Sequence, residues 1–224
     1  MADHPEGVEK EAAAEAPKVP EPAGAAAAGA GAAVPQEAAA EAPKPVVVPR
    51  LKVREFPDPV LREKAVPVTV FDDALKTLVA DMIQTMYAEE GVGLAAPQVG
   101  VSIRLAVLDT SAGEERGKSP FVIINPEILS REGELPWTEG CLSLPGIEVE
   151  TQRSRKITVR SLDIDGHEVT IEAEGLASVA IQHEIDHLEG VLLFDHLSAL
   201  KKRLAIRNYS RERKAERLAA REEE

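Results

Sequence analysis

The sequence predicts an α+β protein, because stretches with strand patterns follow one another and are not separated by helical patterns. The strand patterns lie between residues 103 and 173, and a helical pattern follows at residues 176–189. Alternating strands and helices would instead indicate a parallel sheet. The helical pattern contains His183-Glu184-Ile185-Asp186-His187, and histidines four residues apart lie on the same face of a helix. The sequence therefore also predicts a metal site on this helix.

Composition divides the chain of 224 residues into three regions. The first 50 residues contain 17 Ala, 8 Pro and 4 Gly and no aromatic residue, which is too little bulky apolar surface to offset the entropy of ordering. We expect a disordered tail over residues 1–48 and one compact domain over residues 49–200. A charged helix is expected over residues 201–224.

Charge and hydropathy exclude several classes of protein. The net charge is −13, which argues against DNA binding by the whole chain. No run approaches the roughly 18 apolar residues of a membrane span, and the tail lacks the basic and apolar segments of a secretory signal. The single cysteine excludes an internal disulfide framework. We therefore expect a cytoplasmic protein with no membrane partner.

The first expected element in chain order is a helix that starts after Asp72. Pro57-Asp58-Pro59 signals a turn, and the chain from there to Val68 is expected to be extended or irregular. Asp72 is a favourable N-cap, and Gly91 is placed to end the helix as its C′ residue. Between them, apolar residues recur at helical spacing: Leu75, Leu78, Val79, Met82, Ile83 and Met86. The glycines of residues 91–100 allow the backbone to approach another group closely.

Strands and two helices are expected in the rest of the chain. Strands are predicted at residues 103–108, 121–128 and 147–151. A hairpin of residues 156–164 and 168–173 would be closed by Asp165-Gly166, a favoured two-residue turn. The helix at 176–189 ends before Gly190, and a charged helix with few apolar positions begins at Leu200.

The H-E-x-x-H motif and the only thiol of the chain, Cys141, point to one metal-dependent chemistry. Catalytic zinc-type sites use three protein ligands and leave one position open for water, and Cys141 is the candidate third ligand beside His183 and His187. The metal lowers the pKa of its bound water toward about 7, so that hydroxide can attack a carbonyl derivative such as an amide. Glu184 can act as general acid and base, and Gln98 and a backbone N–H of the Cys141 loop are candidate oxyanion donors.

Other classes match part of this pattern. Metzincin proteases continue H-E-x-x-H with x-x-G-x-x-H, and this chain matches as far as Gly190 but has Leu193 at the last position, with His196 three residues later. A thermolysin-like protease would take a glutamate from further downstream, where Glu212 and Glu216 lie in the charged helix. A structural metal site in an interaction module would need a fourth ligand, and none lies close to the motif in the sequence.

Three segments together resemble the peptide deformylase family: Gly91-Val92-Gly93-Leu94-Ala95-Ala96-Pro97-Gln98, Glu139-Gly140-Cys141-Leu142-Ser143 and Gln182-His183-Glu184-Ile185-Asp186-His187-Leu188-Glu189-Gly190. Their order and spacing match the family, and the resemblance covers about residues 49–200. It implies an α+β fold with antiparallel β-sheets wrapped around the H-E-x-x-H helix. It also implies removal of the N-formyl group from the initiator methionine of newly synthesised polypeptides, with release of formate.

By matching position, the resemblance implies a role for each site residue. The metal ligands would be Cys141, His183 and His187. Glu184 would be the general acid and base, and the donors to the formyl oxygen would be Gln98 and the Leu142 backbone N–H. Gly93 would contact the substrate backbone, and an apolar methionine pocket would be lined by Val92, Trp137, Leu176, Val179 and Ala180. The implied cofactor is one Fe(II) per chain, although these ligands also accept Zn(II), Ni(II) or Co(II).

The C-terminal region is basic, unlike the rest of the chain. Residues 200–224 carry nine Lys and Arg and five Glu, a net charge of +4. The region is similar to that of family members that use a basic helix to dock near the ribosomal exit tunnel, and RNA phosphates would favour its Lys201, Lys202, Arg203 and Arg207. A solvated charged helix is the alternative. The expected partners are thus N-formylmethionyl nascent peptides and, through this helix, the ribosome.

Overall fold

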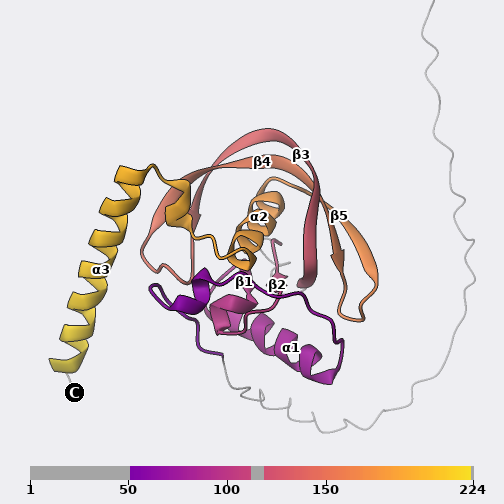
Figure 1. Ribbon diagram of the computed structural model, residues 1–224, viewed down its shortest axis with the longest axis horizontal. Coiled ribbons are helices and arrows are strands. Elements are labelled where there is room, and N and C mark those ends of the chain that lie inside the picture. Colours follow the sequence, from indigo (N-terminus) through magenta and orange to yellow (C-terminus); the bar gives the residue numbers. More distant parts are fainter. Residues whose placement is uncertain (1–50, 112–118, 223–224) are drawn as a thin grey trace, which may run out of the picture. The chain divides into compact units, whose positions relative to one another are not determined.

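The structure, a computed structural model, describes residues 51–111 and 119–222. Within these residues, five strands form one antiparallel sheet in the order β1-β2-β3-β4-β5 (Figure 1). They are β1 (Gly93–Ala95), β2 (Leu105–Leu108), β3 (Phe121–Gly140), β4 (Glu148–Leu162) and β5 (Glu168–Glu174). The α-helices are α1 (Asp73–Ala88), α2 (Leu176–Leu188) and α3 (Ala199–Glu222), and 3-10 helices span Pro59–Arg62, Ala96–Val99 and Leu193–His196. The predicted α+β class is confirmed.

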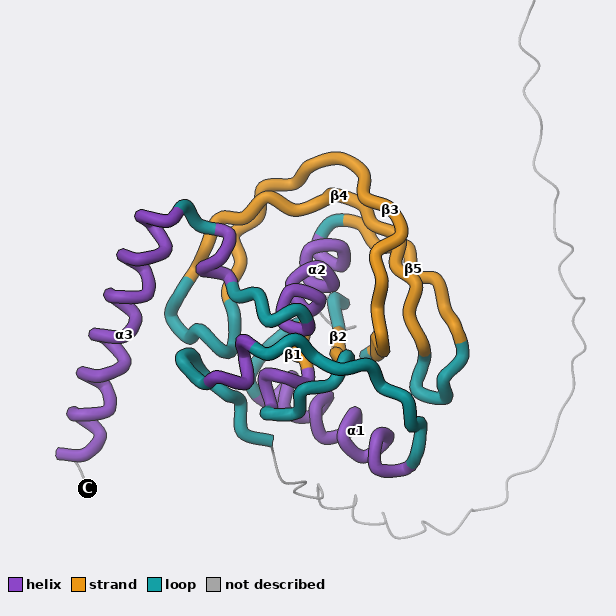
Figure 2. The backbone as a smooth tube through the Cα atoms, in the orientation of Figure 1, coloured by secondary structure: helices purple, strands orange, loops and turns teal. Residues whose placement is uncertain are grey.

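The long strands β3 and β4 bend over α2. They pair from Ile124↔Leu162 to Gly140↔Glu148, with register shifts that follow Ile124 and Ile128 on β3. Asn125 lies at the first shift with φ 51, a left-handed conformation that asparagine tolerates better than most residues. Such irregularities bend a strand and increase its twist. Figure 2 shows both strands curving around α2.

Helix α2 lies beneath this bend and forms part of the core. Its buried Ile181 and Leu188 belong to the same apolar cluster as Ile157 and Val159 of β4. The helix is followed by Gly190, which has φ 72. A Cβ atom at Gly190 would lie 2.6 Å from the carbonyl oxygen of Arg62, so only glycine fits this turn. The helix that carries His183-Glu184-Ile185-Asp186-His187 is therefore held inside the curved sheet.

Helix α1 packs its apolar face on β1 and β2. Met82 and Met86 are fully buried in a second apolar cluster that also contains Leu94 and Val107. The predicted N-cap is confirmed, because the Asp72 carboxylate accepts the backbone N–H of Leu75 at 3.0 Å.

The predicted end of α1 is wrong in detail. The helix ends at Ala88 with Glu89 as C-cap, and Glu90, not Gly91, takes the left-handed conformation with φ 58. Gly91 instead lies close to Leu142, because a Cβ atom at Gly91 would lie 2.9 Å from Leu142 Cδ1 and would displace this side chain.

Removal of the α1 cap should weaken the domain measurably. We expect Asp72→Ala to lower the free energy of unfolding by about 1 kcal/mol, because the first turn loses its hydrogen-bond acceptor. Asp73→Ala is the matched control. Asp73 lies next in the sequence and interacts with the helix dipole, worth about 0.3 kcal/mol, and through its charge with Lys76. Equal losses of stability in the two variants, measured by urea unfolding, would contradict the capping role.

Helix α3 begins by packing on the domain. Tyr209 is 2% exposed, and its ring centroid lies 6.1 Å from that of Phe56 and 6.0 Å from that of Phe194. Ion pairs join Lys202 to Asp195 and Arg213 to Glu55. Among the described helices, none combines the length and the apolar character that a membrane crossing needs.

Several predicted elements differ from the observed ones. The strands expected at 147–151 and 156–164 are one strand, β4, and β3 continues through Gly133 and Pro136 to Gly140. The β4–β5 turn is longer than the predicted two residues, because Asp163 Oδ1 accepts the N–H groups of Asp165 and His167, each at 2.9 Å. Residues 59–62 form a 3-10 helix instead of an extended segment, and Asp58 accepts the N–H of Val60 at its start. The tail predicted for residues 1–48 lies outside the described residues.

Candidate functional site

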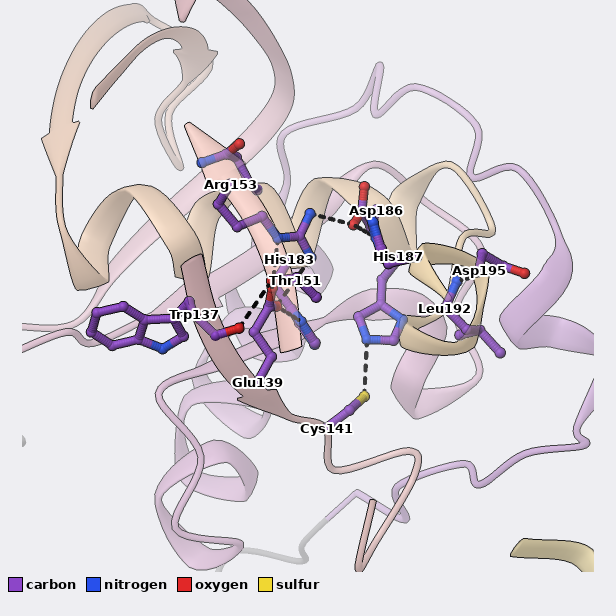
Figure 3. Close-up of polar contacts among 12 residues, drawn as sticks. Trp137, Glu139, Cys141, Thr151, Arg153, His183, Asp186, His187, Leu192 and Asp195 are labelled. Atoms are coloured by element: carbon purple, nitrogen blue, oxygen red, sulfur yellow. Dashed lines mark hydrogen bonds and ion pairs between the residues drawn. The ribbon is translucent and has the colours of Figure 1, made fainter. Parts of the chain in front are cut away.

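The histidines of α2 and the single cysteine meet at one point. Cys141 follows the end of β3, and one ligand atom from each of Cys141, His183 and His187 lies within 4.8 Å of the others. His187 Nε2 is 3.2 Å from Cys141 Sγ (Figure 3). The structure therefore brings together the three predicted ligands, which are 42 and 46 residues apart in the sequence.

The two imidazoles favour the thiolate form of Cys141. Burial raises the pKa of the thiol, but His187 and His183 more than offset this effect and lower the pKa to about 5. In turn, burial lowers the pKa of His183, and hydrogen bonds to Cys141 and Glu139 raise it well above the usual value. A thiolate beside two imidazoles is a donor set suited to a divalent transition metal.

A buried ion pair holds His183 in place. Glu139 accepts a hydrogen bond from His183 Nδ1 at 2.7 Å, so the other ring nitrogen is left to face Cys141 and His187. Arg153 on β4 binds both oxygens of Glu139, at 2.6 and 3.0 Å, and Thr151 also donates to it. Burial raises the pKa of Glu139, but the bonds from His183, Arg153 and Thr151 outweigh it and hold the pKa at about 2.

The same arginine links the site to the surface. Arg153 Nη1 donates to Asp186 Oδ2 at 2.6 Å (Figure 3). His196 Nε2 donates to the same oxygen at 2.8 Å. His196, which stands three residues after the metzincin ligand position, therefore lies outside the cysteine–histidine cluster. Sequence reasoning gave no role to Glu139, Arg153 or Asp186. Glu139 lies two residues before Cys141 and Asp186 lies next to His187, and these positions could have indicated a role for both. No feature of the sequence indicated a role for Arg153.

Glu184 is buried without a full set of hydrogen bonds. It is 3% exposed, and its Oε2 atom has no hydrogen-bond partner among the described residues. Burial raises its pKa to about 7, although His183 and His187 lower it. A cation bound beside Glu184 would lower its pKa from this value, because an opposite charge at short range favours the carboxylate. A carboxyl group with a pKa near neutrality can both accept and donate a proton.

Gly93 is needed because Glu184 lies against it. A Cβ atom at Gly93 would overlap the Glu184 carboxylate, whose Cδ would lie 2.9 Å away. Residues 93–99, predicted only as a glycine-rich segment, form β1 and the 3-10 helix Ala96–Val99. β1 pairs with β2, and this pairing fixes Gly93 opposite Leu108.

The Gln98 side chain is oriented by the backbone N–H of Ala95. Its Oε1 atom accepts the N–H of Ala95 at 2.8 Å, which turns the amide nitrogen toward the site. That nitrogen donates to Ser143 Oγ at 3.2 Å and lies 3.8 Å from Cys141 Sγ. Gln98 is 2% exposed, so its N–H groups are held in a fixed position away from bulk water.

A cavity of about 360 Å³ opens in front of these groups. Its lining includes the predicted substrate-contacting residues and the predicted reacting residues except His187: Val92, Gly93, Gln98, Trp137, Cys141, Leu142, Leu176, Val179, Ala180, His183 and Glu184. One part of the lining is apolar and the other carries the thiol, the imidazole, the carboxyl and the amide. The cavity can therefore hold an apolar side chain with a polar group beside Cys141 and His183. Glu90 and Thr138 also line it and were not predicted.

Comparison with known proteins identifies relatives over the same region. The model of the polypeptide deformylase family matches residues 50–203. The chain is 49% identical to peptide deformylase of Thermodesulfovibrio yellowstonii over 154 residues, which cover 69% of this chain and 93% of the relative. It is 50% identical to that of Alkalilimnicola ehrlichii over 153 residues, which cover 68% and 85%. The crystal structure of a peptide deformylase from Legionella pneumophila superposes with a TM-score of 0.70 at 47% identity, covering 77% of this chain and 99% of that one.

Proposed function

Because this chain belongs to the polypeptide deformylase family, we propose that it removes the N-formyl group from the N-terminal formylmethionine of newly synthesised polypeptides. The products are formate and a free amino terminus. The observation that carries the proposal is the position of Cys141, His183 and Glu184 in the lining of a cavity whose other part is apolar, with His187 grouped with Cys141 and His183.

The donor set fits one divalent metal per chain. A buried thiolate and two imidazoles supply three ligands, and the buried Glu184 Oε2 lacks a partner among the described residues. We propose Fe(II) as the native metal, with Ni(II), Co(II) and Zn(II) as ions that the same ligands accept. When bound, such a metal polarises a carbonyl group and lowers the pKa of water.

The side chains of the chain would supply the remaining chemistry. Glu184 takes a proton from the attacking water and later passes it to the nitrogen of the leaving methionine, which makes the amine a better leaving group. The Gln98 amide and the Leu142 backbone N–H donate to the formyl oxygen as negative charge develops on it. Glu139 and Arg153 keep the His183 ring in its orientation throughout.

The methionine side chain would occupy the apolar part of the cavity. This part is formed by Trp137 on β3, by Leu176, Val179 and Ala180 at the start of α2, and by Val92 before β1. A flexible, polarisable thioether fits such a surface without needing a hydrogen-bond partner. Gly93 leaves the backbone of β1 open to the substrate main chain.

Formate release from matched peptides tests the proposed function. The metal-loaded protein should release formate from formyl-Met-Ala-Ser under anaerobic conditions and should leave acetyl-Met-Ala-Ser intact. It should also fail to cleave an N-blocked peptide internally. Internal cleavage would favour a metalloprotease, and no reaction despite stoichiometric metal binding would favour a structural metal site.

Gly93→Ala should slow turnover by displacing Glu184. We expect kcat to fall about 10-fold or more, because small misplacements of a catalytic group are costly. The melting temperature should change little, because the overlapping group is the end of a flexible side chain. The double variant Gly93→Ala/Glu184→Ala provides the control. If the methyl group acts through Glu184, the double variant will be no slower than Glu184→Ala alone, and a further multiplicative loss would contradict this explanation.

We propose that residues 49–200 are the catalytic domain and that residues 1–48 are dispensable for turnover. The family match at residues 50–203 supports this division. A chain that starts at residue 49 should keep the kcat and KM of the full chain for formyl-Met-Ala-Ser. The proposal would be contradicted if the shortened chain lost activity and a separate peptide of residues 1–48 restored it.

We also propose that α3 docks on the ribosome. Lys201, Arg203 and Arg207 are exposed on it, whereas Lys202 forms an ion pair with Asp195. Reversal of the three exposed charges should weaken co-sedimentation with ribosomes and reduce its dependence on salt, while turnover of short peptides is unchanged. Unchanged co-sedimentation would leave α3 as a solvated helix.

A further inference from the structure

His196 is the outer end of a series of hydrogen bonds that leads to His183. Its Nε2 atom donates to Asp186 Oδ2 at 2.8 Å, and the same oxygen accepts Arg153 Nη1 at 2.6 Å. Arg153 binds both oxygens of Glu139, which accepts His183 Nδ1 at 2.7 Å. Three side chains therefore connect His196 to a proposed metal ligand.

Burial increases along this series from the surface inward. The His196 and Asp186 side chains are 28% and 27% exposed, so both can also reach water. Arg153 and Glu139 are buried. A buried polar group has no water to replace a lost partner, so the orientation of Glu139 depends on where the Arg153 guanidinium lies.

Asp186 fixes the position of this guanidinium. The Nε and Nη2 atoms of Arg153 bind Glu139, and Nη1 binds Asp186. The group is planar and rigid, so contacts on two sides set its rotation as well as its place. A movement of Asp186 would therefore be passed to Glu139 through Arg153.

The His196 side chain reaches Asp186 from a well-anchored segment. His196 is the last residue of the 3-10 helix Leu193–His196, in which Phe194 is fully buried. Asp195 in the same helix forms ion pairs with cations from two other elements. The donor is thus held in place, and it can keep the Asp186 carboxylate from turning toward water.

We propose that His196 is a positioning residue for the metal centre. It holds Asp186 against Arg153, and the buried pair that follows keeps His183 in the orientation in which it binds metal. The inference rests on the proposed metal centre. His196 does not line the reaction cavity, so the expected effect is on metal binding and not on the binding of substrate.

The test measures Co(II) binding to the full chain after its metal has been removed by a chelator. Loss of a group that directly holds a ligating histidine costs about 10- to 100-fold in metal affinity, and His196 acts through further side chains. We therefore expect His196→Ala to raise the dissociation constant of Co(II) about 5-fold. The visible absorption of bound Co(II), which depends on ligand geometry, should shift. With saturating metal, KM for formyl-Met-Ala-Ser should be unchanged.

Three variants serve as controls. His196→Gln keeps an N–H donor close to the position of Nε2 and should restore the wild-type affinity and absorption. His167→Ala removes another exposed histidine that pairs with an aspartate, Asp163, and should change neither. The double variant His196→Ala/Asp186→Ala should bind Co(II) as Asp186→Ala alone does, because both substitutions interrupt the same series.

The outcomes separate positioning from simple support of the fold. Unchanged Co(II) affinity and absorption in His196→Ala would overturn the proposal even if the melting temperature fell, because His196 would then only tie the 3-10 helix to α2. Equal weakening in His196→Ala and His196→Gln would overturn the hydrogen bond as the cause. Failure of the wild-type chain to bind Co(II) would overturn the proposed metal centre itself.

Discussion

Replacement of Glu184 should abolish turnover and leave the metal in place. We expect kcat for formyl-Met-Ala-Ser to fall about 1000-fold in Glu184→Ala, because general acid–base catalysis contributes roughly 10²- to 10⁴-fold. The three proposed ligands are untouched, so the variant should bind one equivalent of metal. Its stability should not fall by more than about 1 kcal/mol, because the substitution also removes a buried carboxyl with an unsatisfied oxygen.

The isosteric variant separates proton transfer from packing. Glu184→Gln keeps the volume of the side chain and cannot accept the proton, so it should be as slow as Glu184→Ala. The test measures metal content by elemental analysis, and kcat, on the same samples of both variants. Full activity in either metal-loaded variant would show that another group moves the proton.

Loss of Arg153 should have the largest effect on stability. In Arg153→Ala the Glu139 carboxylate stays buried, at 5% exposure, without its bidentate partner. Breaking a buried ion pair by removing one member costs about 3–5 kcal/mol. Because Glu139 orients His183, we also expect metal affinity to fall about 10- to 100-fold.

A neighbouring arginine provides the matched control for this prediction. Arg155 lies two residues along β4, is exposed, and contacts the Glu134 carbonyl at 3.4 Å. Arg155→Ala should change the free energy of unfolding by less than about 0.5 kcal/mol and leave metal affinity unchanged. The free energy of unfolding and the metal affinity of Arg153→Lys should lie between those of Arg153→Ala and Arg155→Ala, since lysine keeps the charge but not the forked geometry. Equal unfolding curves for Arg153→Ala and Arg155→Ala would contradict the role of the buried pair.

The sequence predicted those parts of the site that depend on local spacing. His183, Glu184 and His187 belong to one helix, and helical geometry alone places them together. The Asp72 cap of α1 is predictable for the same reason, because its acceptor and donor are three residues apart. The end of α1 was less predictable, since Glu90 adopts a left-handed conformation that glycine usually takes.

Contacts set by strand register could not be predicted from the sequence. The Glu139–Arg153 pair spans 14 residues, and Arg153–Asp186 spans 33. The first pair exists because β3 and β4 are paired far beyond the predicted strand ends, and the second because β4 packs against α2. Proline and glycine inside β3, at Pro136 and Gly133, interrupt the local strand pattern, whereas pairing with β4 maintains the strand. β1 could not be predicted for a similar reason. Its glycine and alanine residues give no strand signal, and its pairing with β2 is not local.

Titration of activity against metal tests the central claim most directly. The protein is stripped of metal by a chelator and reloaded anaerobically with Fe(II), and formate release from formyl-Met-Ala-Ser is measured at each step. We predict no turnover in the stripped protein, and a linear rise that reaches its plateau at one equivalent per chain. Turnover by the stripped protein, or one bound equivalent at Cys141, His183 and His187 without formate release, would contradict the account.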